Sequence, residues 1–125
     1  MILLDANILL EMIIIGRPQR ASIFRWMEQN KEPYCISMLT VHLALYFGLK
    51  DNLTISDLKT FLSNYPKIAI LPEDYVEAMK ILKNRDHEDA LQLAVAERIG
   101  CTYIVTLDHK FSSVYSDRIK FINPA

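Results

Sequence analysis

Short apolar runs recur along the chain and alternate with longer stretches in which apolar residues are spaced as in helices. The runs lie at positions 2–4, 34–36, 68–71, 103–105 and 119–122. Each is too short for a buried helix and suits a strand that is covered on both faces. Short strands that alternate with helices predict an α/β domain with a mainly parallel sheet, here of four to five short strands.

The segments between these runs predict helices with recognisable ends. Ser37, for example, is a plausible N-cap for the helix that follows it. In the helix over 72–84, we expect Val76, Met79 and Leu82 to face inward because they recur at helical spacing. The expected helices span 8–14, 18–30, 39–49, the stretch from Thr54 or Ser56 to Pro66, 72–84 and 86–99, and a short helical turn precedes the last strand.

The composition is that of one folded domain without a strong charge. The chain has 125 residues, of which 51% are hydrophobic, so we expect a single domain over residues 1–125 with a substantial core. Its net charge of −1 lacks the basic excess of a general nucleic-acid coat protein. Any role with nucleic acid must therefore rest on a local patch or on a metal.

Two features bear on the cellular compartment. Cys35 and Cys101 are far apart and match no zinc spacing, so we expect buried free thiols, which fit a reducing cytoplasm. The first 15 residues are apolar, but Asp5 and Glu11 interrupt them. We therefore expect neither a signal peptide nor a membrane span in this stretch.

Acidic residues stand where several of the expected elements meet. Asp5 directly follows the first strand, and Asp108 follows the fourth. Asp86, Glu88 and Asp89 open the helix that leads into that fourth strand. A helix that leads into a parallel strand runs antiparallel to it, so its N-terminus lies at the carboxyl edge of the sheet, where functional groups gather. We therefore expect these acids to converge at one edge.

Each acid also has a purely structural interpretation. Asp5 fits as the cap of the helix that begins near Ile8. Asp86 and Asp89 fit a capping pair, at the N-cap and three residues later, and we assign Asp86 to that role and Asp89 to a ligand role. Asp108 fits an ordinary turn. Three acids at one predicted edge nevertheless favour a shared site over three separate structural roles.

Carboxylates that converge in this way need a compensating cation, because their mutual repulsion raises their pKa values. Carboxylate and water oxygens suit Mg²⁺ or Mn²⁺. Beside a phosphodiester, such a metal activates water and stabilises charge on the phosphate, which is the chemistry of nucleases. Asn7, Thr106 and Ser37 are candidates to position the water or to hold the carboxylates by hydrogen bonds.

Three segments carry a resemblance that covers nearly the whole chain: MILLDANILLE at the start, CISMLT in the middle and RDHEDALQLAVAERIGCTYIVTLDHKF near the end. The chain resembles PIN domains, and specifically the VapC-like toxins of bacterial type II toxin–antitoxin pairs. The resemblance implies a three-layer α/β/α fold and a metal-dependent ribonuclease that cuts tRNA, rRNA or mRNA. It also implies a cognate antitoxin protein that blocks the site, and a homodimer. Asp5, Asp89 and Asp108 match the acids of the family, and Asn7 and Thr106 match its supporting polar positions.

The resemblance breaks at one position. Family members usually carry a Glu on the helix after the I-S-x-x-T segment, and Leu43 stands there in this chain, next to His42. His42 is one candidate to replace this Glu as a ligand, because imidazole is acceptable to Mn²⁺ though poor for Mg²⁺. Alternatively, His42 is an ordinary surface residue of its helix without a role in the site. Glu11 and Glu88 are the other candidates for a fourth acid. The missing Glu weakens the expected metal site.

Three hypotheses follow for the function. The first is a VapC-like endoribonuclease in which Asp5, Asp89 and Asp108 bind Mg²⁺ or Mn²⁺ and carry the catalysis. The second is a catalytically weakened PIN domain that binds RNA or a protein, and the third is a phosphate-handling enzyme of another α/β family. Candidates for an RNA-steering surface are Arg17, Arg20, Arg25, Lys50 and Lys110, and candidates for a proton shuttle or a phosphate contact are His87 and His109.

Overall fold

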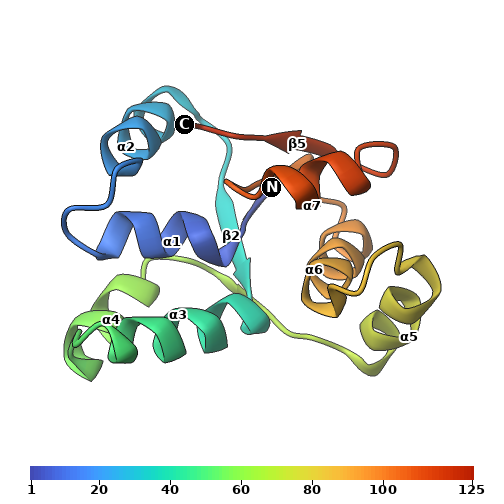
Figure 1. Ribbon diagram of the computed structural model, residues 1–125, viewed down its shortest axis with the longest axis horizontal. Helices are drawn as coiled ribbons and strands as arrows, with labels where there is room; N and C mark the ends of the chain where they lie inside the picture. The colour runs from blue at the N-terminus through green and yellow to red at the C-terminus, as the bar shows by residue number, and fades with distance from the viewer.

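The computed structural model describes residues 1–125, in which one sheet lies between two layers of helices (Figure 1). In chain order the elements are β1 (Ile2–Leu4), α1 (Ala6–Ile13), α2 (Arg20–Gln29), β2 (Tyr34–Ser37), α3 (Met38–Lys50), α4 (Ile55–Leu62), β3 (Lys67–Ile68), α5 (Pro72–Ile81), α6 (His87–Arg98), β4 (Tyr103–Val105), α7 (His109–Val114) and β5 (Lys120–Ile122). The predicted α/β class and the alternation of strands with helices are confirmed.

All five strands are parallel, in the order β3-β2-β1-β4-β5. The first strand is central: Leu3 pairs with Cys35 of β2 on one side and with Ile104 of β4 on the other. The chain builds outward from β1 to β3 and then returns to the other side of β1 for β4. The strand order therefore reverses between β1 and β4, and a crevice forms at the carboxyl ends of the strands at such a point.

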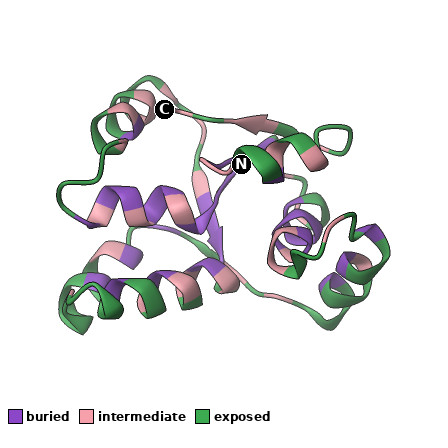
Figure 2. Ribbon diagram, viewed as in Figure 1, coloured by how far each residue is buried: buried purple, intermediate pink, exposed green.

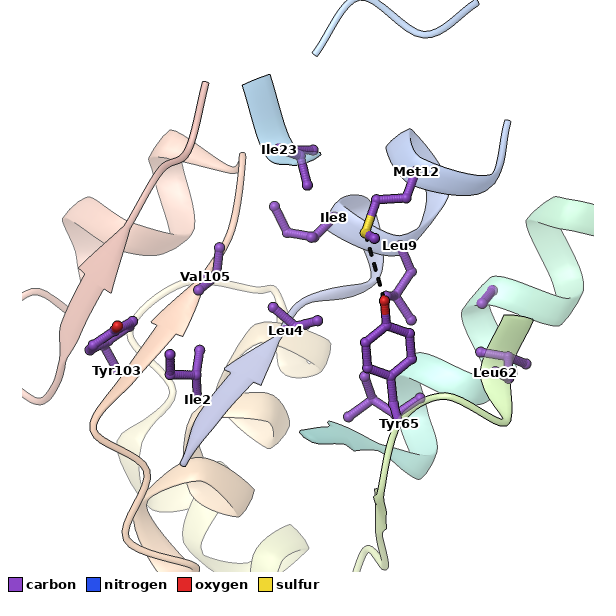
Figure 3. Packing of buried hydrophobic residues seen from close by; sticks show 12 residues of the cluster. Ile2, Leu4, Ile8, Leu9, Met12, Ile23, Leu62, Tyr65, Tyr103 and Val105 are labelled. Atoms are coloured by element: carbon purple, nitrogen blue, oxygen red, sulfur yellow. Dashed lines mark hydrogen bonds between the residues drawn. The ribbon is translucent and has the colours of Figure 1, made fainter. Parts of the chain in front are cut away.

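The side chains of β1 alternate between two cores, one on each face of the sheet. Ile2 and Leu4 belong to a cluster with residues of α1, α2 and α3, where the Tyr65 hydroxyl lies 4.0 Å from the Met12 sulfur (Figure 3). Leu3 belongs to the opposite cluster, built on α5, α6 and α7. All three residues of β1 are buried, because helices cover both faces (Figure 2). The predicted three-layer α/β/α arrangement is confirmed.

Side-chain caps mark the starts of most of the helices. The Ser37 hydroxyl accepts a hydrogen bond from the Thr40 backbone N–H (3.2 Å) and caps α3 as predicted. The first helix begins at Ala6, two residues before the predicted start. The reason is that Asp5 is itself the N-cap, with its carboxylate accepting from the Ala6 N–H at 2.8 Å. The strand end and the helix start therefore meet at one carboxylate.

The prediction of a buried strand at 68–71 is wrong. The third strand is the two-residue segment Lys67–Ile68, in which the first residue is exposed and the second half-buried. It lies at the edge of the sheet and pairs only with β2. An edge strand is covered on fewer sides, so its apolar run does not require full burial.

The predicted inward face of α5 is also wrong. Val76, Met79 and Leu82 are 50%, 41% and 37% exposed, and the buried apolar residues of the helix are Ala78 and Ile81. Both sets recur at helical spacing, so the sequence period alone did not distinguish them. The small alanine side chain lets α5 approach α6 closely, and this packing turns the larger residues outward.

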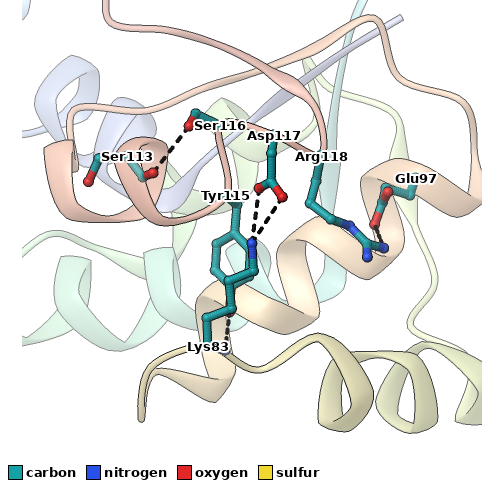
Figure 4. A network of polar contacts seen from close by, with 7 residues as sticks. All are labelled: Lys83, Glu97, Ser113, Tyr115, Ser116, Asp117 and Arg118. Atoms are coloured by element: carbon teal, nitrogen blue, oxygen red, sulfur yellow. Dashed lines mark hydrogen bonds and ion pairs between the residues drawn. The ribbon is translucent and has the colours of Figure 1, made fainter.

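A polar network fastens the segment after α7 to α5 and α6 (Figure 4). The Lys83 ammonium pairs with both Asp117 carboxylate oxygens at 3.0 and 3.1 Å, and the Lys83 N–H donates to the Tyr115 hydroxyl at 3.2 Å. The Arg118 guanidinium donates to Glu97 at 2.7 Å. These contacts hold α7 in place, and the N-terminus of α7 forms part of the candidate site.

Two simpler expectations concern the cysteines and the membrane. Cys35 is a buried free thiol, whereas Cys101 is free but only half-buried. None of the helices combines the length and the apolarity that crossing a membrane requires.

Candidate active site

The carboxylate of Asp5 sits at the carboxyl end of β1 and is held by hydrogen bonds from several directions. Its side chain is buried, with 9% exposure. Besides the Ala6 N–H, the Thr106 hydroxyl donates to Oδ2 at 2.8 Å and the Gln92 amide donates to Oδ1 at 3.2 Å. The Asn7 amide lies at 3.4 Å from Oδ2, a long contact that leaves this oxygen the less saturated of the two. Asp5 is thus both a helix cap and an oriented anion.

Thr106 and Asn7 tie the end of β4 to the start of α1. The Asn7 amide donates to the Thr106 hydroxyl at 3.1 Å, and the Leu107 N–H donates to Asn7 Oδ1 at 3.1 Å. The Asp108 N–H donates to the Thr106 hydroxyl at 3.0 Å. The Thr106 hydroxyl thus accepts two hydrogen bonds and donates one to Asp5. These three bonds use its full hydrogen-bonding capacity. These two predicted supporting residues fix the backbone on which Asp5 and Asp108 stand.

Gln92 is the residue of this network that the sequence reasoning missed. Its side chain is buried, with 2% exposure, on the face of α6 that meets the sheet. Its amide nitrogen donates to Asp5 Oδ1 and, at 2.7 Å, to Thr40 Oγ1, while its carbonyl oxygen accepts from the Ser37 hydroxyl at 2.5 Å. Ser37 therefore acts on Asp5 through Gln92. The available signal was its position three residues after Asp89, which places both on one helical face.

The other acids stand at helix starts. Asp86 caps α6, as predicted, with Oδ1 accepting from the Asp89 N–H at 3.1 Å. Asp108 caps α7, with Oδ1 accepting from the Lys110 and Phe111 N–H groups at 3.0 and 3.1 Å. Both carboxylates therefore lie at the N-terminal ends of helices, where orphan backbone N–H groups are available to them. Capping and membership of a shared site are therefore compatible here.

A cleft of about 400 Å³ brings these acids together at the switch between β1 and β4. One wall carries five carboxylates and the other carries apolar side chains of α3. The lining consists of Asp5, Asp86, Glu88, Asp89, Gln92, Asp108, Leu39, Leu43 and Phe47. All three acids predicted to bind a metal thus line one cleft. Asn7, Thr106 and Ser37 lie behind it and support it.

The candidates for a fourth acid differ in whether their side chains line the cleft. Leu43 lines the cleft, so an apolar side chain stands where the family pattern places a Glu. His42 is exposed and not part of the lining. Glu11 is buried, with 8% exposure and no hydrogen-bond partner for Oε2, but does not line the cleft either. Glu88 does line it, and so supplies the additional acid, whereas His87 and His109 are exposed outside it.

The electrostatics of the cleft show uncompensated negative charge. Burial raises the pKa of Asp89 to about 8, and repulsion from Asp86, Asp5 and Asp108 adds to the effect. Burial also raises the pKa of Asp5, against the hydrogen bonds from Thr106, the Ala6 N–H and Gln92, which lower it. No Lys or Arg lines the cleft. An external cation would relieve this repulsion.

The comparison with protein families decides the identity of the fold. A family model described as PIN domain matches residues 2–116. The chain belongs to the PIN domain family. No match to a curated protein sequence was found.

Solved structures share the fold of this PIN domain. A toxin–antitoxin complex from Klebsiella pneumoniae aligns with a TM-score of 0.78 at 19% identity, covering 100% of this chain and 98% of that chain. VapC20 from Mycobacterium tuberculosis, a sarcin–ricin loop cleaving toxin, aligns with a TM-score of 0.77 at 13% identity, covering 90% and 94%. FitAcB from Neisseria gonorrhoeae aligns with a TM-score of 0.76 at 18% identity, covering 99% and 98%. The fold is therefore VapC-like.

The donor set of the PIN domain fits a hard divalent cation by its chemistry. Every polar side chain that lines the cleft offers a carboxylate or an amide oxygen, which Mg²⁺ and Mn²⁺ prefer. No three His, Cys, Asp or Glu side chains stand close enough together to form a ready-made metal site. Burial is the main cause of the raised pKa of Asp89, and repulsion from the neighbouring carboxylates adds to it. Mg²⁺ commonly keeps several waters and uses few carboxylates, which suits such spacing.

Proposed function

We propose that this PIN domain is a divalent-metal-dependent endoribonuclease, the toxin of a type II toxin–antitoxin pair. The observation that carries the proposal is the convergence of Asp5, Asp89 and Asp108 on one cleft at the strand-order switch. These residues come from three separate elements, and only the parallel topology brings them together. A cleft with five carboxylates and no basic side chain is unsuited to a phosphodiester unless a cation is also bound.

Asp5, Asp89 and Asp108 would hold Mg²⁺ or Mn²⁺. When bound, such an ion lowers the pKa of a water and stabilises negative charge on the phosphate. The chain's own contribution is orientation. Thr106 and Gln92 hold the Asp5 carboxylate in one rotamer, and the Asn7–Thr106 pair fixes the backbone turn that carries Asp108. This preorganisation means that few groups must move when substrate binds.

Asp89 has a distinct role in proton balance. With its pKa raised to about 8, the carboxyl holds a proton at neutral pH when no cation is present. Binding a divalent cation requires the carboxylate form, so cation affinity should increase with pH up to about this value. The neighbouring Asp86 and Glu88 add charge that attracts the cation without being required as ligands.

The partners follow from the fold and from the names of the structural neighbours, two of which are toxin–antitoxin or FitA-containing complexes. We propose a cognate antitoxin that covers the cleft, a tRNA, rRNA or mRNA substrate, and action in the cytoplasm. The exposed apolar residues of α5, Val76 and Met79 among them, are candidate contacts for a homodimer.

A second candidate function is favoured by one observation. Leu43 lines the cleft where a Glu is expected, so the site has one carboxylate fewer on the α3 side. A PIN domain weakened in this way would bind RNA or a protein partner without cutting it. Glu88 offsets the loss in total charge but approaches from α6 rather than from α3.

Cleavage of a pooled RNA substrate with and without Mn²⁺ tests these alternatives. We expect metal-dependent cleavage that falls by more than about tenfold in Asp5→Asn and in Asp89→Asn. Asp89→Asn matters because this residue is half-buried, so its loss disturbs the core less than a change at Asp5. Equal cleavage by wild type and both variants would refute the nuclease proposal, and RNA binding without any cleavage would establish the second candidate.

A further inference from the structure

A second pocket, of about 450 Å³, adjoins the acidic cleft. Its lining is Leu10, Arg17, Phe47, Lys50 and Asp51. Phe47 lines both hollows, which therefore neighbour each other at this side chain, and we call the two together the groove. The pocket is built where the loop after α1 meets the C-terminal end of α3, two segments that the sequence separates by about 30 residues.

The charges of this pocket oppose those of the cleft. Arg17 makes no ion pair or hydrogen bond through its side chain, and Lys50 contacts only the Tyr46 ring, at 5.8 Å. Asp51 supplies one opposing charge, which leaves the pocket with a net charge of +1. The other predicted steering residues lie outside the pocket, and Arg20 donates to the Met12 carbonyl at 2.9 Å. Arg17 and Lys50 are therefore free to bind an anion.

Phe47 offers an exposed aromatic surface between the two charges. The side chain is 43% exposed, although it is large and apolar. The neighbouring Tyr46 ring packs against it in a T-shaped arrangement, at 5.1 Å and 87°. An exposed aromatic ring in a groove is a typical stacking platform for a nucleic-acid base, because every base has a flat apolar face.

We propose that Arg17, Phe47 and Lys50 form a nucleotide subsite for single-stranded RNA, an inference that rests on the proposed nuclease function. The phosphodiester to be cut lies at the carboxylates, the adjacent base stacks on Phe47, and Arg17 with Lys50 binds a phosphate further along the strand. This order of groups matches the alternation of phosphate and base in an unpaired strand. An acidic peptide is less suitable, because it has no flat bases to stack on the exposed Phe47 ring between the two charges.

The test is the affinity of a fluorescein-labelled six-nucleotide RNA, measured by fluorescence anisotropy with Mn²⁺ in the Asp5→Asn background, where cleavage is suppressed. Arg17→Gln/Lys50→Gln should weaken binding by about tenfold and make the salt dependence shallower by roughly one to two phosphate contacts. The matched control is Lys31→Gln/Lys80→Gln, which removes the same charge from two exposed residues outside the groove. Control and groove variants that bind equally would overturn the proposal.

Substitutions of Phe47 give a second, independent test of the proposal. Phe47→Leu should weaken RNA binding by roughly tenfold, while Phe47→Tyr keeps the affinity because it keeps the ring. Equal affinity of the Leu and Tyr variants would refute stacking, and thermal melting verifies that both are folded. If Phe47→Leu does not fold, the Arg17/Lys50 pair decides, since both residues are exposed.

Two further outcomes distinguish the subsite proposal from the nuclease proposal. If RNA binds through these residues but wild type never cleaves, the subsite stands and the nuclease proposal fails. If cleavage occurs and the groove variants leave its KM unchanged, the nuclease proposal stands and the subsite fails. A peptide of alternating Glu and Leu that binds more tightly than RNA, and loses affinity in Arg17→Gln/Lys50→Gln, would overturn the assignment to RNA.

Discussion

Replacing Asp89 by Asn is expected to make the metal-free protein more stable at pH 9 and to leave its stability near pH 3 almost unchanged. The pKa of Asp89 rises from an ordinary 3.8 to about 8 on folding, with burial as the main cause. Between these values the folded state holds a proton that the unfolded state has lost. Stability therefore decreases as pH rises through this window, and the full penalty is present above pH 8. Asn removes the charge and keeps the shape.

The size of the effect follows from the same pKa change. Converted in full, a change from 3.8 to about 8 would correspond to about 6 kcal/mol. Asp89 is only half-buried, so solvent screening reduces the penalty to about 1–2 kcal/mol. With a typical slope of about 2 kcal/mol per molar urea, the unfolding midpoint should increase by roughly 0.5–1 M.

Urea unfolding in EDTA at pH 3, 7 and 9 measures this directly. The wild-type midpoint should decrease with pH relative to that of Asp89→Asn, and Mn²⁺ should restore the wild type more than the variant. Glu28→Gln, which removes one exposed carboxylate from α2, controls for net charge. A constant difference between wild type and Asp89→Asn across the three pH values would show that folding does not raise the pKa of Asp89.

Three further substitutions test the site and its support. Gln92→Leu removes one hydrogen bond from each of three buried partners and should lower the free energy of unfolding by about 2–4 kcal/mol in urea. The exposed Gln29→Leu should change it by less than about 0.5 kcal/mol, and equal effects of the two substitutions would refute the bridging role. Gly48→Ala places a Cβ 2.6 Å from Leu58 Cδ2 and should destabilise by about 1–3 kcal/mol, and an unchanged melting temperature would contradict this close packing of α3 on α4. Leu43→Glu should tighten Mn²⁺ binding, measured by calorimetry, by several-fold because it adds a carboxylate to the cleft, and Leu43→Gln should not; similar affinities for both would show that Leu43 lies too far from the cation.

Much of the fold was predictable because its signals are local. Apolar runs bounded by polar residues located β1, β2 and β4, and Ser37 and Asp86 marked helix starts by capping, which depends only on neighbouring residues. Asp108 was interpreted as a turn residue, and the structure shows that it caps α7. The strand β3 and the buried face of α5 were mispredicted because apolar spacing does not say which neighbour covers a residue.

Other parts of the site depended on contacts between distant segments. Gln92 bridges Asp5, Ser37 and Thr40, and its spacing from Asp89 places it on the same helical face without showing that it contacts these three residues. Its neighbour Leu93 is equally buried in a purely apolar environment. Only packing of α6 against the sheet turns this amide toward Asp5.

By itself, the sequence determined which acids end strands and open helices, because a parallel sheet places both at its carboxyl edge. The tertiary structure decided how those acids are surrounded. It placed Leu43 rather than His42 in the cleft and raised the pKa of Asp89 by burial beside other carboxylates. It also brought Arg17, Phe47 and Lys50 together in the lining of one pocket. Burial, repulsion and shared pockets arise from distances between remote residues, and these distances exist only after α1, α3 and α6 have packed on the sheet.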